Sequence, residues 1–221
     1  LDDNAYSNDE YTQFMNEALV NGPQSFLPSS DLGAALELDR GRWSARGVLM
    51  NIGENDDGNS FTFWGTQLGY RAETPWGEGN YRVLVVGSSD DFPDPGGMRE
   101  ERRFAVGLSF DQQLGETFGA WLRLGWQDDR AVVTYDSIYS GGINIRGAAW
   151  GRPNHEVGLG YGYLVGGNQD VNSAHVAEVY YRVAVNEYFA LSADVQYMRD
   201  DSRFADGPSG FILGLRGTLE F

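Results

Sequence analysis

Residues 210–221 read GFILGLRGTLEF, and apolar and polar side chains alternate along this stretch. One face carries Phe211, Leu213, Leu215, Gly217, Leu219 and Phe221, and the other carries Ile212, Gly214, Arg216, Thr218 and Glu220. A period of two with charged residues on one side predicts a β-strand with one dry and one wet face. The dry face would meet a second sheet in a soluble sandwich, or lipid in a membrane barrel. This strand alone leaves both alternatives open.

The same alternation recurs upstream and predicts about eleven strands. Besides 210–221, we expect strands at 32–39, 42–50, 61–72, 80–87, 103–110, 120–126, 139–150, 157–163, 177–185 and 189–198. Short turns are predicted near 114–116 and 186–187, whereas 128–137 and 199–209 are predicted to be long polar loops. Short turns at one end of a sheet and long loops at the other are typical of outer-membrane barrels.

The polarity of the wet face decides between the two alternatives. Glycine and charged residues recur there at strand centres, where a soluble barrel would place a packed apolar core. The chain also has 30 Gly, 12 Tyr, 12 Phe and 6 Trp, which suits tilted strands with aromatic belts. No apolar run approaches the roughly 20 residues of a membrane helix. We therefore predict an all-β fold, an antiparallel transmembrane β-barrel of the bacterial outer membrane with about 10–12 strands in this chain.

Charge and cysteine content exclude other classes of protein. The net charge is −16, which argues against binding nucleic acid, because such proteins present basic surfaces. Without cysteine there are no disulfides and no thiolate metal sites. We expect one domain over 1–221, with an irregular stretch at 1–30 in which 11–19 is a strand or loop rather than a short helix. No secretory signal precedes Leu1, so the sequence is expected to be mature, trimmed or a fragment.

Several short segments resemble the carbohydrate-selective porins of the OprB family, in the same order along nearly the whole chain. They are NAYSNDE (4–10), QFMN (13–16), LGA (32–34), GNYR (79–82), LSFDQ (108–112), WLRLGW (121–126), EVYYR (178–182), DVQY (194–197) and LGLR (213–216). The resemblance implies an outer-membrane sugar channel, in which Phe221 matches the terminal aromatic signal for membrane insertion. The resemblance implies a barrel of about sixteen strands, a size within the known range, and this chain resembles the later, larger part of the pattern. Either early strands are absent from it or the barrel is short and its pore narrow.

The arginines predicted to face the lumen are the sharpest candidate site. By alternation they are Arg82, Arg103, Arg123, Arg182 and Arg216, with Arg46 as a further candidate, and Glu178, Asp194 and Glu220 share their face. Sugar hydroxyls need donors and acceptors, together with an aromatic ring for the apolar side of the sugar. Trp121 and Tyr180 are the candidates for that ring, and Trp64 is a third. The alternative is that these charges pair across strands and only stiffen the wall.

Two acidic loops, 54–59 and 90–97, contain the carboxylates and glycines found in calcium loops. Neither fits the spacing of an EF-hand loop. The prediction for both is a solvated loop, or a loop folded inward to narrow the pore, and no metal site is predicted.

The two histidines test whether the chain is an outer-membrane hydrolase. His175 has Ser173 two residues away on the same face, and His155 begins a strand. No orienting acid stands at a useful spacing for a Ser–His pair. Both histidines are predicted to be polar residues at a strand rim, and no enzyme activity is predicted.

The function expected is passive diffusion of small hydrophilic solutes, sugars first, with no cofactor and no covalent step. Outer-membrane lipid and small sugars are the expected partners, and a homo-oligomer is left as an open alternative. The alternatives are a general or cation-preferring pore, a plugged structural barrel and, less favoured, a lipid hydrolase. An open lumen would argue against the plugged barrel.

Overall fold

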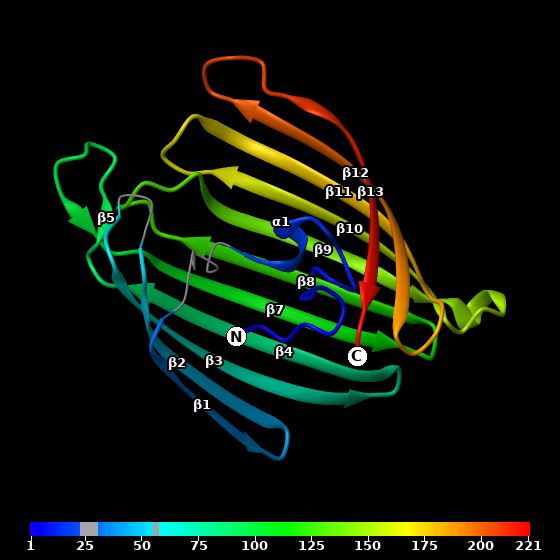
Figure 1. Ribbon diagram of the computed structural model, residues 1–221. Coiled ribbons are helices and arrows are strands. Elements are labelled where there is room, and N and C mark those ends of the chain that lie inside the picture. Colours follow the sequence, from blue (N-terminus) through cyan, green and yellow to red (C-terminus); the bar gives the residue numbers. More distant parts are fainter. Residues whose placement is uncertain (23–30, 55–57) are drawn as a thin grey trace.

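The structure is a computed structural model that describes residues 1–22, 31–54 and 58–221. Eleven strands form one antiparallel sheet in the order β1-β2-β3-β4-β7-β8-β9-β10-β11-β12-β13 (Figure 1). Their bounds are β1 Gly33–Arg40, β2 Trp43–Ile52, β3 Phe61–Thr74, β4 Gly77–Ser88, β7 Phe104–Leu114, β8 Phe118–Gln127, β9 Tyr135–Arg146, β10 His155–Gly166, β11 Val171–Ala184, β12 Phe189–Ser202 and β13 Ser209–Leu219. A separate hairpin pairs β5 Phe92–Pro93 with β6 Glu100–Glu101, and the two short helices are α1 Glu17–Val20 and η1 Gly147–Trp150. The predicted all-β antiparallel fold is confirmed.

The two ends of the sheet differ as the sequence predicts. At one end the turns are tight, and Gly41 and Gly115 adopt positive φ angles of 63° and 69° there, which glycine tolerates best. Longer connections run at the other end, between β4 and β7 and between β8 and β9. We call these the turn end and the loop end.

Two predicted loops are shorter than expected. β12 continues to Ser202, so the predicted loop 199–209 shrinks to the residues before Ser209. β9 begins at Tyr135, inside the predicted loop 128–137. In both places polar residues continue the strand pairing: Arg199 pairs with both His175 and Ser209. Strands that extend beyond an apolar belt lose their alternation while keeping their backbone ladder, so the sequence pattern ends before the strand does.

The outer face of the sheet is apolar. On β13, Phe211, Leu213 and Leu215 are 74, 79 and 80% exposed. The same face continues across the sheet through Leu49, Leu68, Val83, Leu122, Ile143, Leu159, Val179, Leu191 and Val195. A contiguous apolar surface of this extent is unfavourable in water and is the expected surface of a membrane barrel.

Aromatic residues of the outer face gather toward the two ends of the strands. The Trp43–Tyr70 and Tyr81–Phe110 ring pairs lie toward the turn end, and the Trp64–Phe104, Trp126–Tyr139 and Tyr197–Phe211 pairs lie toward the loop end. Trp and Tyr favour membrane interfaces because their rings are amphipathic. The prediction that Trp64 faces the lumen is wrong, because the alternation of β3 turns Phe63 and Gly65 inward and Trp64 outward.

The sheet curves around the N-terminal segment, which lies in its hollow (Figure 1). Strands β1 and β13 are the two edges of the sheet, and among the described residues they pair only with β2 and β12. Every residue of β1 is exposed. In the part of the chain that the structure describes, no helix is long and apolar enough to cross a membrane.

Candidate functional site: a strap across the charged lumen face

Residues 1–22, which we call the strap, lie along the concave face of the sheet (Figure 1). They run through turns up to Asn16, whose side chain accepts a hydrogen bond from the Ala18 backbone N–H and caps α1. The expectation of a strand or loop at 11–19 is therefore wrong for its last part, which is helical. The cap explains this, because Asn at this position satisfies a backbone donor that a short helix otherwise leaves free.

Arg123 of β8 is the central anchor of the strap. Its side chain is fully buried. Nε donates to the Asp2 carboxylate at 2.8 Å, and the guanidinium also donates to the backbone oxygens of Ser7 and Leu19. The planar, multidentate guanidinium suits such a site, because a single group can satisfy several acceptors in fixed directions. Arg123 therefore ties three points of the strap to the wall.

A second anchor lies toward the turn end and is built around Asp3. Arg82 Nε and Arg46 Nη1 each lie 2.6 Å from one of its carboxylate oxygens. Arg82 also forms a 2.6 Å ion pair with Asp111 on the neighbouring strand β7. This anchor combines pairing within the wall with pairing to the strap. Arg46 faces the lumen, as predicted from its alternation.

The third anchor holds the part of the strap that leads into α1. The Glu178 carboxylate accepts the backbone N–H groups of Met15 and Asn16 at 2.6 and 2.9 Å. From β13, Arg216 donates to the backbone oxygens of Glu10 and Gln13. Glu178 is almost completely buried, so these two hydrogen bonds replace the water that a carboxylate would otherwise need.

The predicted aromatic platform is covered by the strap. Phe14 packs edge-on against Trp121 and Tyr180, with ring centroids 5.5 and 5.1 Å apart. The Tyr180 hydroxyl donates to Glu156 and accepts from Asn144 at 2.7 Å. Both platform rings are buried, so they form the seat of the strap in this structure.

Of the remaining predicted residues, Asp194 lies beside Glu178 of the third anchor, and Arg103 lies apart from all three anchors. Arg103 donates to Gln127 at 2.8 Å near the loop end. Asp194 is buried and accepts from Gln196 at 2.9 Å, whereas Arg182 is only partly buried. Phe221 ends the chain fully exposed.

Comparison with known proteins agrees with this architecture. The model of the carbohydrate-selective porin, OprB family, matches residues 1–221. The chain belongs to this family. An uncharacterized protein of Aquifex aeolicus is 28% identical over 225 residues, covering 100% of this chain and 60% of that protein. A high-pH structure of Pseudomonas putida OprB superposes with a TM-score of 0.77 at 14% identity, covering 100% of this chain and 67% of that one.

Membership in the OprB family establishes in which membrane such proteins lie and that they are not enzymes. These porins are outer-membrane proteins, and the apolar outer face is the surface expected of a membrane barrel. They are also not enzymes. His155 contacts the Tyr181 hydroxyl, and His175 lies 2.7 Å from the Tyr161 hydroxyl on the outer face. In the described residues, no group of three His, Asp or Glu side chains is arranged to hold a metal ion.

In this OprB-family chain, the structure describes the acidic loop 90–97 completely and the acidic loop 54–59 only in part. Residues 55–57 of the 54–59 loop lie outside the described residues. In the 90–97 loop, Asp94 accepts the backbone N–H groups of Arg99 and Met98, and these bonds hold the pKa of Asp94 below its ordinary value. The carboxylate is therefore occupied in shaping the β5–β6 turn.

The Asp3 anchor predicts a response to acid. Partial burial raises the pKa of Asp3, but attraction by Arg82 and the hydrogen bond from Arg46 outweigh it and leave the pKa below the ordinary 3.8. Because the folded pKa is lowered, the stabilisation is present above about pH 4 and is lost as pH falls through the folded value. We expect single-channel conductance to change between pH 5 and pH 2.

The matched variant Asp3→Asn should lose this part of the acid response. Its conductance at pH 5 should already approach that of the unsubstituted protein in acid. An acid response of equal size in both proteins would show that Asp3 is not the group that titrates.

Proposed function

We propose that this protein lets small hydrophilic solutes, carbohydrates first, diffuse passively across the outer membrane through a lumen narrowed by the strap. The main support for the proposal is that buried Arg and carboxylate groups hold the strap against the charged lumen face of the sheet. Membership in the OprB family favours carbohydrates as the solute. The chain spans 60% of the Aquifex relative, so the activity of the whole protein belongs to this proposal.

The residues proposed to contact solute overlap with those that hold the strap only at the Asp3 anchor and at Arg216. Arg123, Glu178, Trp121 and Tyr180 are engaged by the strap, and we assign them to positioning it. A cavity of about 290 Å³ remains at the turn end, and its lining includes Arg42, Arg46, Arg71, Arg82, Asp3, Glu78 and Asn80. Sugar hydroxyls both donate and accept, so a wall that mixes guanidinium, carboxylate and amide groups suits them. Arg103, Arg182, Arg216 and Asp194 are proposed to complete the charged wall.

A cation-preferring pore is the second candidate. Acidic residues gather in the connections at the loop end: Asp90, Asp91, Asp94, Glu100, Glu101, Asp128 and Asp129. Negative charge at a pore mouth raises the local concentration of cations, most strongly at low salt.

Liposome swelling distinguishes these candidates. We expect vesicles containing the protein to swell quickly in isotonic monosaccharide and progressively more slowly in di- and tetrasaccharide, because the strap restricts the passage. Replacing Arg46 with glutamine should alter the ratio of mono- to disaccharide rates, since Arg46 lines the cavity and holds Asp3. Protein-free vesicles are the control.

Absence of swelling in any sugar would favour the plugged barrel and contradict the proposal. Equal swelling in all sugars, together with a cation-selective reversal potential in a salt gradient, would favour the second candidate.

A further inference from the structure

The outer face of strands β10 to β13 changes in chemistry from the middle of the sheet toward the loop end. The strand register defines rows of residues that lie side by side across these strands. The middle row is aliphatic and consists of Leu159, Val179, Val195 and Leu213. The next row is mostly aromatic and consists of Tyr161, Ala177, Tyr197 and Phe211. The third, which we call the polar row, consists of Tyr163, His175, Arg199 and Ser209.

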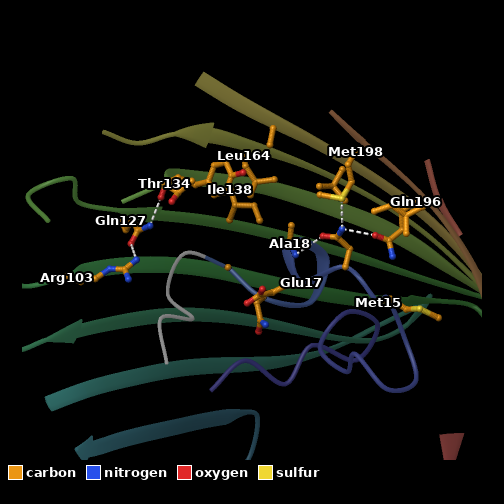
Figure 2. A pocket seen from close by; sticks show the side chains of 17 residues that line it. Met15, Glu17, Ala18, Arg103, Gln127, Thr134, Ile138, Leu164, Gln196 and Met198 are labelled. Carbon is orange, nitrogen blue, oxygen red and sulfur yellow. Dashed lines mark hydrogen bonds between the residues drawn. The ribbon is translucent and has the colours of Figure 1, made fainter. Parts of the chain in front are cut away.

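The polar row points away from the lumen. Gln196 and Met198 of β12 line the cavity beside α1 on the lumen side of the sheet (Figure 2). Because neighbours along a strand point to opposite faces, Tyr197 and Arg199 point outward. Both side chains are exposed. Arg199 therefore places a charge on a face that is otherwise apolar.

The polar row lies at the level expected for lipid headgroups. The four residues from Leu213 to Ser209 carry β13 about 13 Å along the strand, close to half the roughly 25 Å apolar band of membrane barrels. The aromatic row lies between them, and aromatic rings favour the membrane interface. Longer loops of outer-membrane barrels are extracellular, so we expect the loop end, with the polar row, at the outer leaflet.

Arg199 and His175 supply the hydrogen-bond donors of the polar row. They are direct partners across β11 and β12, so their Cβ atoms lie about 5 Å apart and both side chains can reach one ligand. The Tyr161 hydroxyl lies 2.7 Å from His175 Nδ1, and the Tyr163 and His175 ring centroids are 5.0 Å apart. When Tyr161 donates this hydrogen bond, the neutral imidazole carries its proton on Nε2 and can donate it to a ligand. Two such donors suit the oxygens of an anion.

Pairing within the protein does not account for Arg199. Among the described residues no ion pair involves its guanidinium, although Asp201 lies two residues further along the same face. The chain carries a net charge of −16, so acidic partners are not scarce. An unpaired cation next to aromatic and aliphatic rows fits a ligand that has an anionic head and an apolar body.

We propose that the polar row binds the phosphate group of an outer-leaflet lipid. Arg199 and His175 contact the phosphate, and the Tyr197–Phe211 ring pair contacts the first part of the acyl chains. Arginine suits this role because its planar guanidinium forms paired hydrogen bonds with phosphate oxygens. The site lies on the outer face, so it does not depend on which solute passes through the lumen.

The test is native mass spectrometry of the full chain in detergent, with diphosphoryl lipid A as the probe and the Kd of the first bound lipid as the readout. Arg199→Gln should weaken binding about fivefold, because a guanidinium–phosphate contact at an exposed place is lost. Arg40→Gln is the matched control and should leave the Kd unchanged, since Arg40 is equally exposed but ends β1 at the turn end. Lipid A freed of both phosphates should bind equally to the unsubstituted protein and to Arg199→Gln.

Two further variants test the sign of the charge effect and the role of the imidazole. Asp201→Asn removes a negative charge beside the proposed phosphate and should tighten binding about twofold. His175→Gln should weaken binding, because the ring donor next to Arg199 is lost. Heat-modifiable gel migration verifies that each variant folds.

Inorganic phosphate distinguishes a lipid from a free anion. Millimolar phosphate should leave lipid A bound, because the acyl chains and the aromatic row also contribute to binding. Displacement of lipid A at that concentration would assign the polar row to a free anion and overturn the lipid proposal. Equal Kd values for Arg199→Gln and Arg40→Gln, or weaker binding by Asp201→Asn, would show that the polar row is not the site.

Discussion

Replacing Arg123 with alanine is expected to free the strap and give the largest rise in single-channel conductance of any single substitution in the lumen. Removal of the guanidinium leaves the Asp2 carboxylate and the Ser7 carbonyl without their donor in a buried place, and the Leu19 carbonyl then accepts only the Ser7 hydroxyl. Breaking a buried ion pair from one side costs about 3–5 kcal/mol, because the remaining charge is left uncompensated. Movement of the strap into the lumen solvent is the route by which these groups regain water.

Conductance in planar bilayers and urea unfolding in lipid vesicles measure the two consequences separately. Arg130→Ala is the control, since the Arg130–Asp128 pair is exposed and such pairs contribute about 1 kcal/mol or less. Arg123→Lys should give an intermediate result, because an ammonium keeps the charge without the guanidinium fork. If Arg123→Ala leaves both conductance and unfolding unchanged, the strap is not held as described.

The strands and their faces could be predicted because their pattern is local. In 177–185 and 189–198 each residue reports its face through its neighbours two positions away, and the observed strands β11 and β12 follow those stretches. The same alternation placed Arg82, Arg123 and Glu178 on the lumen face, where they are buried. The prediction that Trp64 faces the lumen was wrong because apolar and polar residues alternate less regularly in the sequence of β3.

The strap could not be predicted, because nothing periodic marks its contacts. Asp2 and Arg123 are separated by 121 positions, and Glu10 and Arg216 by 206. The sequence left two alternatives for the arginines, contact with sugar and pairing within the wall. Arg82 pairs within the wall with Asp111, but it also binds Asp3 of the strap. Neither alternative included a contact with the strap. A signal was present in the NAYSNDE stretch at 4–10, whose polar residues suit an irregular segment that docks on charged groups.

Leu213→Arg is expected to lower the stability of the barrel in lipid by about 2–4 kcal/mol, the cost of Arg near the midplane of a membrane barrel. Leu213 lies near the middle of β13, pairs with Val195 and is 79% exposed on the outer face. A guanidinium there is far from both ends of the strand and must draw water or headgroups into the apolar belt.

Ile212→Arg is the matched control, one residue away on the same strand with its side chain on the lumen face. Ile212 pairs with Gln196, and Arg216 stands further along the same face, so a new guanidinium meets polar groups and water. Urea titration of both variants in vesicles should give a large loss for Leu213→Arg and a small one for Ile212→Arg. Because the two residues are adjacent on β13 and both pair with β12, a difference between them reports the two faces of the sheet. Equal losses would mean that the exposed leucines of β13 do not meet lipid, and the assignment of the sheet's two faces would then fail.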